Sequence, residues 1–344
     1  MAHRDIILKG KAVGPHKAFM APSFESSTVL VDDQFDYVEL WLKRHAPTET
    51  VIFWCQARNF YRVSLGLPKE SRALTAYYCM LNATKALLAA KGISFSEQHG
   101  VAGESPGSRT SLANEVCSIK GAGLLPSLAQ YFGANLADRE VCLKDILYSI
   151  PFVHRAYTIT YRGSQNLFIP IADAHFVRQP TGQEAWFCAT ITDPRYQKDA
   201  FVQKQRGWER DYGETGKFVI RSKHRFKWKV RGTPKAIRMA NLTKNHRKIR
   251  RDIKYIHGPS RLWYFKRNDK EAGILAWPTP ALVYIAMHRL SELTRYDPKR
   301  LNRHFECQHN WLISEFLNSA NDNFIDQIAS DITGQEFMIP GYRK

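Results

Sequence analysis

The feature that most constrains the fold is one helical stretch, residues 71–92, which reads SRALTAYYCMLNATKALLAAKG. Its large apolar side chains recur with the period of an α-helix and form a broad face that includes Leu74, Tyr77, Leu81 and Leu88. Alanines lie between them and allow a second helix to approach closely. The glycine that ends the stretch stands where helix C-caps favour glycine. The sequence therefore predicts a long helix that packs closely against another helix.

Helical periodicity continues on both sides of this stretch and returns near the end of the chain, whereas the middle alternates between apolar and polar residues. Helices are expected at residues 36–46, 48–65, 277–296, 300–320 and 324–332, and strands at residues 166–177, 184–192, 217–232 and 261–265. Between the last two strands, residues 240–258 are expected to form a basic helix.

This order of elements predicts an α+β fold that is mainly α. The N-terminal and C-terminal helices are expected to pack into one bundle, and a basic, β-containing segment is inserted between them. For the 344-residue chain we expect an N-terminal helical part at residues 1–135, the insert at 136–270, and a C-terminal helical part at 271–344.

The net charge of the chain is concentrated in one place. The whole chain has a formal charge of +18, and residues 216–270 contain 19 lysines and arginines but only two acidic residues. The rest of the chain has 31 basic and 30 acidic residues. Because a single segment holds nearly all of the excess, the sequence predicts a polyanionic partner for that segment.

The remaining composition argues against several classes of protein. The six cysteines include no C-x-x-C pair, so we expect buried free thiols, no metal site and no cofactor. The first residues, MAHRDIILKG, lack the apolar core of a signal peptide, and no apolar run has the length of a membrane span. These features predict a cytoplasmic protein with no membrane partner.

The basic segment is the first candidate site. Cations at positions 225, 227, 229 and 231 alternate with Phe226, Trp228 and Val230, so the strand is expected to have one cationic face and one apolar face. Lysine and arginine bind phosphates, and interleaved aromatic residues can stack on unpaired bases, although Phe226 and Trp228 fit the core beneath the cations better. The residues expected to contact nucleic acid are Arg221, Lys223, Arg225, Lys227, Lys229, Arg231, Lys244, Arg247, Lys248, Arg250, Arg251 and Lys254.

A second candidate site is the heptapeptide RHFECQH, Arg303 to His309. RNA cleavage without a metal needs a base for the 2′-hydroxyl and a cation for the phosphate, and Arg303, His304 and His309 supply these groups. The same spacing occurs once more, between Arg251 and His257. The sequence alone leaves open which pair, if either, is catalytic.

Residues 76–101, AYYCMLNATKALLAAKGISFSEQHGV, resemble the signature of the HEPN superfamily of helical bundles. The longer pattern, supported by residues 56–64, 142–157 and 293–317, is similar to the YaaC-like family. This resemblance implies a helical bundle, often a homodimer. Many HEPN-like proteins cleave RNA as toxins or effectors of prokaryotic defence, with an Arg–His motif in the terminal helices, whereas others only bind.

Two functions are therefore predicted, and both use nucleic acid, with RNA favoured over DNA. The first is a metal-independent endoribonuclease with Arg303, His304 and His309 as its catalytic residues. The second is a non-catalytic nucleic-acid-binding protein or a subunit of a defence complex. An acidic protein partner, a solvated cationic face and lipid headgroups are the alternatives for the basic segment.

Overall fold

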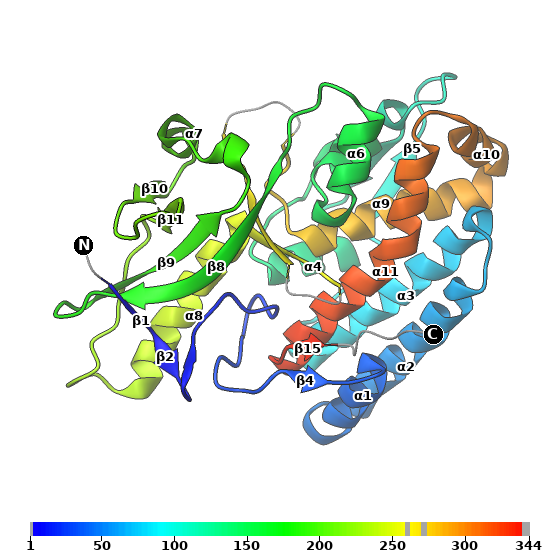
Figure 1. Cartoon of the computed structure of the whole chain (residues 1–344). Helices are drawn as coiled ribbons and strands as arrows, with labels where there is room; N and C mark the ends of the chain where they lie inside the picture. Colours follow the sequence, from blue (N-terminus) through cyan, green and yellow to red (C-terminus); the bar gives the residue numbers. More distant parts are fainter. Residues whose placement is uncertain (1–2, 259–261, 270–273, 339–344) are drawn as a thin grey trace. The chain divides into compact units, whose positions relative to one another are not determined.

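The structure is a computed structural model that describes residues 3–258, 262–269 and 274–338, and it has an α+β fold (Figure 1). The chain forms two compact units, and each is built from segments that are distant in the sequence. The sheet unit comprises residues 1–29, 167–272 and 334–336, and the helical unit comprises residues 30–166, 273–333 and 337–344.

These units differ from the predicted division chiefly at two long segments, and residues 334–336, predicted in the C-terminal helical part, also belong to the sheet unit. Residues 136–166 belong to the helical unit, because β7 (Glu140–Cys142) pairs with β6 (Val116–Ile119) and α5 (Leu143–Tyr148) packs against α9 (Thr279–Tyr296). Residues 1–29 belong to the sheet unit, where β1 (Arg4–Asp5) pairs with β8 (Phe168–Arg178). Segments this short have no hydrophobic periodicity, so their sequence does not indicate the unit against which they pack.

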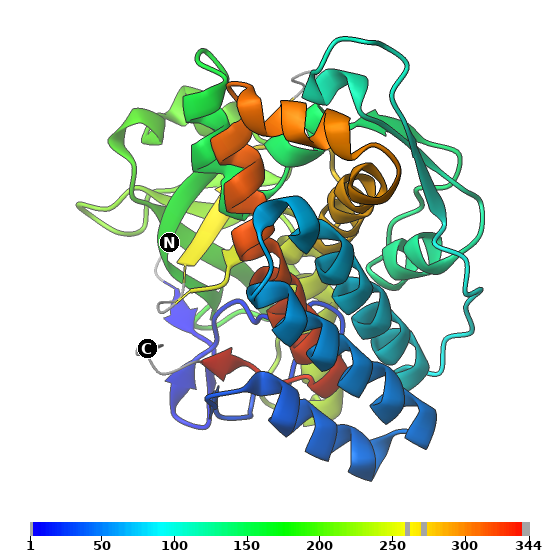
Figure 2. The ribbon, with the colours of Figure 1, turned by 90° about the vertical axis from the view of Figure 1, so that its right-hand side faces the viewer.

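The helical unit is built around α3 (Lys69–Ala90), which packs against α2 (Thr48–Leu65), α9 (Thr279–Tyr296) and α11 (Asn310–Thr333). Figure 2 shows α1 (Gln34–His45) and α2 beside α11. Ala73, Ala76, Ala83 and Ala86 of α3 are fully buried, whereas Ala89 and Ala90, at the end of the helix, are half-buried. Gly92 has a φ of 64°, in the left-handed region that favours glycine, and the predicted helix end at this position is confirmed.

Smaller elements complete the helical unit. Strand β5 (Val101–Glu104) joins β6 and β7 in an antiparallel sheet. The shorter helices are α4 (Leu124–Tyr131), α6 (His154–Thr160) and α10 (Pro298–Glu306), and β4 (Val29–Leu30) pairs with β15 (Phe337–Met338). In the described part of the chain, no helix is long and apolar enough to cross a membrane.

The predicted helix at residues 300–320 is interrupted. Helix α10 ends at Glu306, and α11 starts at Asn310 and continues to Thr333, which includes the segment expected as a separate helix at 324–332. Cys307 adopts an extended conformation with ψ of 168°, so the chain turns between the two helices. The heptapeptide 303–309 therefore does not lie on one straight helix.

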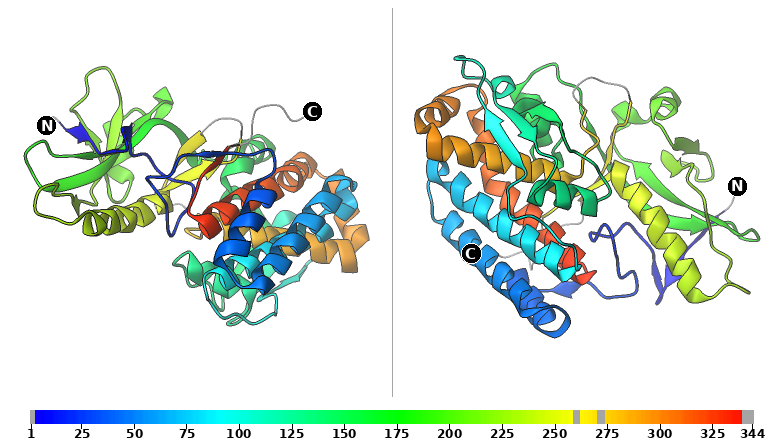
Figure 3. Two further views of the ribbon diagram at one scale, coloured as in Figure 1. Left: turned by 90° about the horizontal axis from the view of Figure 1, so that it is seen from below. Right: turned by 180° about the vertical axis from the view of Figure 1, so that it is seen from behind.

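The sheet unit contains an antiparallel sheet in the order β10-β11-β9-β8-β14-β13. The strands are β8 (Phe168–Arg178), β9 (Glu184–Ile191), β10 (Trp208–Asp211), β11 (Val219–Ser222), β13 (Ile253–Ile256) and β14 (Leu262–Lys266). Short β12 (Phe226–Lys227) pairs with β9, and β2 (Ile7–Leu8) forms a hairpin with β3 (Lys11–Ala12). Helix α7 (Asp199–Lys204) contacts β10, and α8 (Lys235–Asp252) lies along the strands (Figure 3).

Helix α8 defines two faces of this sheet. On the inner face, Ile220 and Phe265 belong to the same buried cluster as Leu242 and Ile249 of α8. On the outer face, a smaller cluster contains Val177, Trp186, Cys188 and Val219. The side chains of successive strand residues point to opposite faces, so each predicted contact residue on β11 and β12 can be assigned to one face.

The single strand predicted at residues 217–232 is divided into β11 and β12. Phe226 and Trp228 pack in the inner cluster, as predicted, but Val230 is 51% exposed. Trp263 and Phe265, two further aromatic residues of the basic segment, are also buried in that cluster. The alternation ends after Trp228 because β12 has only two residues, and the chain then turns towards α8.

Candidate functional site

The heptapeptide RHFECQH lies at the junction of α10 and α11. The carboxylate of Asp297 accepts the backbone N–H of Arg300 at 3.0 Å and caps the start of α10. Arg303, three residues further along, is exposed, whereas His304 and His309 are 0% and 3% exposed. Nδ1 of His304 and Nε2 of His309 are hydrogen-bonded at 2.8 Å.

The two imidazoles are part of a buried network around Glu115. Oε1 of this carboxylate accepts from Nε2 of His304 at 2.8 Å and from Nε of Arg300 at 2.6 Å. Oε2 accepts from Nη2 of Arg289 at 2.6 Å and from the hydroxyl of Ser105 at 2.8 Å. Glu115 is fully buried, so these donors replace the water that a buried carboxylate loses.

This network sets the protonation of its members. Burial alone would raise the pKa of Glu115, but the hydrogen bonds from His304, Arg300 and Arg289 outweigh burial and lower that pKa to about 2. Burial, followed by the charge of His304, lowers the pKa of His309 to about 4. Glu115 is therefore ionised and His309 neutral at pH 7.

His304 and His309 lie in contact with each other, but Arg303 does not lie with them. A nuclease site needs the base and the phosphate-binding cation on one accessible surface. Here the imidazoles are enclosed and hydrogen-bonded to each other and to Glu115, while Arg303 faces solvent. The network acts as a structural link between α10, α11 and the segment that contains Glu115.

The second Arg–His match lies in the sheet unit. Arg251 is exposed near the end of α8, and His257 is half-buried just after β13. The strand between them, Ile253 to Ile256, is extended, so the six-residue spacing places these two residues on different elements.

A second buried polar cluster lies between α3 and α9, and no pattern in the sequence predicts it. The hydroxyl of Tyr77 is hydrogen-bonded to Nδ1 of His99 at 2.6 Å and to the hydroxyl of Tyr284 at 3.0 Å. The ring of His288 lies 5.0 Å from that of Tyr77, and burial lowers the pKa of His288 to about 3. Tyr77 and His99 are 22 positions apart in the sequence, and only the fold reveals their contact.

The twelve basic residues predicted to contact nucleic acid fall into three groups. Eight are exposed: Lys223, Lys227, Lys229, Arg231, Lys244, Arg247, Lys248 and Arg251. Arg221 and Arg225 are half-buried and share the carboxylate of Glu209 at 2.7 and 2.8 Å. These two cations are already largely neutralised within the protein.

Arg250 and Lys254 require a correction, because both are buried, at 3% and 8% exposure. Arg250 donates to the backbone oxygens of Ile253 and Lys17, each at 3.2 Å, and lies over the ring of Trp263. Burial, followed by the charge of Lys266, lowers the pKa of Lys254 well below its ordinary value. Both residues stabilise the sheet unit and do not face solvent.

Four of the exposed cations form one stripe along α8. Lys244, Arg247, Lys248 and Arg251 are spaced by three or four residues, which places them on one side of a helix with 3.6 residues per turn. Leu242 and Ile249, on the opposite side, are buried against the sheet. Within the part of the chain that the structure describes, none of the four forms an ion pair with a carboxylate. We call these four residues the α8 stripe.

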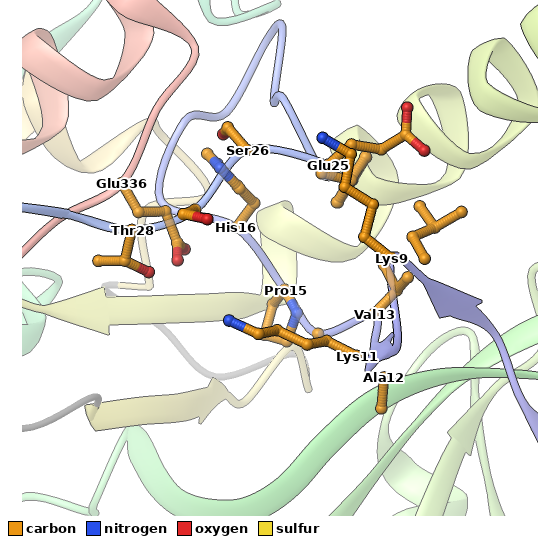
Figure 4. Close-up of a pocket in the computed structure, with 14 residues that line it drawn as sticks. Lys9, Lys11, Ala12, Val13, Pro15, His16, Glu25, Ser26, Thr28 and Glu336 are labelled. Carbon is orange, nitrogen blue, oxygen red and sulfur yellow. The ribbon is translucent and has the colours of Figure 1, made fainter.

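The sheet unit also contains a cavity of about 200 Å³ beside the β2–β3 hairpin (Figure 4). Lys9 and Lys11 of the hairpin line it together with Glu25 and Glu336. Glu25 forms an ion pair with Lys235 at 2.6 Å. Because charges of both signs line this cavity, it does not extend the cationic surface of α8. Among the described residues, no group of histidines, cysteines and carboxylates is arranged to hold a metal ion.

These features define a two-unit α+β protein in which a helical unit with buried polar networks accompanies a sheet unit with a cationic helix. The chain belongs to the YaaC-like family, because the model of that family, described as "YaaC-like Protein", matches residues 22–332. No curated protein and no solved structure shows significant similarity to the chain.

Proposed function

We propose that this protein binds nucleic acid through the α8 stripe, with RNA as the favoured ligand. The single observation that carries the proposal is the row of four exposed cations on α8 that have no carboxylate partner in the described residues. Lysine and arginine rows of this kind bind phosphate groups and release the counterions of the nucleic acid. The preference for RNA rests on the resemblance of residues 76–101 to the HEPN superfamily.

The energetics of α8 support a polyanionic partner. The stripe contains two like-charge pairs at a spacing of four residues, Lys244–Lys248 and Arg247–Arg251. Each such pair destabilises a helix by roughly 0.2–0.5 kcal/mol at low salt. Some other cations of the same unit are matched with acids, as in the Lys235–Glu25 pair. A bound phosphate backbone would relieve the repulsion that the free helix carries.

The endoribonuclease is the weaker alternative. A helical bundle with an Arg–His motif in its terminal helices supports it, but the enclosure of His304 and His309 by the Glu115 network argues against direct access of RNA to these groups. RNA incubated with the protein in EDTA tests this alternative. Cleavage that is lost in His309→Ala but retained in Arg251→Ala would favour the nuclease and assign it to the terminal motif.

The binding proposal is tested by fluorescence anisotropy with labelled RNA and DNA at several salt concentrations. The logarithm of the affinity should fall with the logarithm of salt by roughly 0.7–0.9 for each phosphate contacted. The double variant Lys244→Glu, Lys248→Glu should weaken binding strongly and reduce this slope by about two contacts.

A matched control has the same change in net charge at two exposed lysines of the helical unit, Lys120→Glu with Lys299→Glu. It should bind like the wild type, apart from a small long-range effect. An affinity that does not depend on salt, or an equal loss in the control, would overturn the proposal. Tight binding of acidic proteins or anionic vesicles without binding of nucleic acid would favour the two other partners instead.

A further inference from the structure

The cavity beside the β2–β3 hairpin contains two lysines that no carboxylate of the described residues neutralises. Lys9 and Lys11 line the cavity, and within the part of the chain that the structure describes neither forms an ion pair. The carboxylate of Glu25, which also lines the cavity, is already paired with Lys235 at 2.6 Å. Two ammonium groups at this cavity are therefore available to an anionic ligand.

Lys9 is held in a backbone conformation that lysine rarely adopts. It forms the two-residue turn of the hairpin together with Gly10, and the φ angles of the two residues are 45° and 77°. Positive φ at both positions is typical of a type I′ turn, which favours asparagine and glycine. Strained residues of this kind cluster at binding sites, where a function offsets their cost. The strain at Lys9 therefore indicates a role for its ammonium group.

Two buried polar side chains also line the cavity. His16 and Glu336 are 6% and 9% exposed. Nδ1 of His16 accepts the backbone N–H of Ala18 at 3.0 Å, and Oε1 of Glu336 accepts that of Lys17 at 3.0 Å. Both side chains are thus held in position by the protein itself, which lowers the entropic cost of binding a ligand.

Figure 4 shows how these groups are distributed along the cavity. His16, Thr28 and Glu336 are grouped at one end. Lys9 lies at the opposite end, and the side chain of Lys11 extends from the hairpin towards the first group. The volume of about 200 Å³ is below the roughly 300–1,000 Å³ of pockets for drug-sized ligands. A matching ligand is therefore small, with an anionic group for the lysines and hydroxyl groups for the other end.

We propose that this cavity binds a sugar phosphate, either as a free molecule or as the terminal ribose phosphate of a nucleic acid. A phosphate monoester has a charge of about −1.5 to −2 at pH 7, which matches the two lysines. Sugar hydroxyls donate to carboxylates such as that of Glu336, and the hydroxyl of Thr28 both donates and accepts. An amino acid has no net charge and would leave both lysines unbalanced. The inference does not depend on the α8 stripe.

The test is isothermal titration calorimetry of the full-length protein with ribose 5-phosphate, ribose and inorganic phosphate. Ribose 5-phosphate should bind more tightly than either part, because it alone contacts both ends of the cavity. Lys9→Asn and Lys11→Gln should each weaken its binding by about tenfold, the usual effect of one lost hydrogen bond to a charged group. Thr28→Val should weaken binding of ribose 5-phosphate but not of inorganic phosphate.

The Lys9→Asn variant separates binding from folding. Asparagine tolerates positive φ better than lysine does, so the melting temperature of this variant should equal or exceed that of the wild type. Circular dichroism measures this temperature. Lys120→Asn, at an exposed lysine of the helical unit, is the matched control and should bind ribose 5-phosphate as the wild type does.

RNA strands with and without a 5′-phosphate identify the source of the ligand. If Lys9→Asn weakens binding of the phosphorylated strand alone, the ligand is a nucleic-acid end, and if it changes neither strand, the ligand is a free sugar phosphate. The α8 variant Lys244→Glu, Lys248→Glu should bind ribose 5-phosphate as the wild type does, so the two proposals fail separately. The cavity proposal is overturned if ribose 5-phosphate does not bind up to about 10 mM. Equal affinity for inorganic phosphate, or wild-type affinity in both lysine variants, overturns it too.

Discussion

At the scale of single residues, Glu115 is the most constrained side chain in the helical unit. It is fully buried and accepts hydrogen bonds from two arginines and a histidine. Removal of one partner from a buried ion pair typically costs about 3–5 kcal/mol, because the remaining charges stay desolvated. We therefore expect Glu115→Gln to lower the free energy of unfolding in urea by roughly that amount.

The matched control for this change is Glu306→Gln on α10, where the carboxylate is exposed. Exposed ion pairs contribute little, so the control should differ from the wild type by less than about 0.5 kcal/mol. Equal stability of the two variants would show that the Glu115 network is not a major stabilising feature.

His309 gives the helical unit a pH dependence. Burial lowers its pKa to about 4, whereas a histidine in the unfolded chain has a pKa near 6.5. Between these values the unfolded state binds more protons, so the free energy of unfolding should fall as the pH falls from about 6.5 to 4. We expect His309→Gln to reduce the slope of that fall, measured by urea unfolding at pH 7, 6 and 5.

An exposed histidine of α1 supplies the comparison, because His45→Gln changes a side chain that is not enclosed by the fold. The free energy of unfolding of the His45→Gln variant should depend on pH as that of the wild type does. If His309→Gln also follows the wild-type curve, the histidine is accessible to protons in the folded state.

Neither of these roles could be predicted from the sequence. Glu115 is 174 positions from Arg289 and 189 positions from His304, and the residues around it show no periodicity. The heptapeptide predicts Arg303, His304 and His309 as catalytic residues, and in the structure the imidazoles of His304 and His309 are hydrogen-bonded to each other. Their enclosure depends on a partner from another element, and no pattern within the motif contains that information.

At the scale of elements, α3 is the best-predicted feature, and its alanines determine how closely its neighbours approach. Ala86 is fully buried, whereas Ala90, one turn further, is half-buried. Enlarging a side chain in a close-packed core costs about 1–3 kcal/mol. We expect Ala86→Leu to lower the melting temperature clearly and Ala90→Leu to have little effect. Equal melting temperatures would contradict close packing around this turn of α3.

Elements with a long, consistent period were predicted well, and short or two-faced ones were not. Helix α2 has the predicted bounds, residues 48–65, because its pattern is uninterrupted. The strand expected at 217–232 breaks in two, since nothing in its alternation shows where pairing with β9 stops. In α8 the helix was predicted, but its dense charge hid the side that packs on the sheet, so Arg250 was wrongly placed with the surface cations.

At the scale of the whole molecule, most of the sheet unit is an insertion in the helical unit. The residues before and after this insertion contact the same part of the helical unit. The hydroxyl of Tyr148 donates to the backbone oxygen of Gln165 at 3.0 Å, and the backbone N–H of Leu275 donates to the hydroxyl of Ser149 at 3.2 Å. The two ends of the insert thus contact consecutive residues. A short Gly/Ser linker from Asn166 to Ile274 can therefore replace residues 167–273, and residues 1–29 can be removed with them.

We expect this shortened protein to unfold cooperatively, because the helical unit has its own core around α3, α9 and α11. It should lose the salt-dependent affinity for RNA, since the α8 stripe is removed. Circular dichroism melting and fluorescence anisotropy measure the two properties separately. The full-length variant Lys244→Glu, Lys248→Glu is the control for lost binding in an intact chain. A folded helical unit that still binds RNA with the wild-type salt dependence would place the binding surface outside the sheet unit.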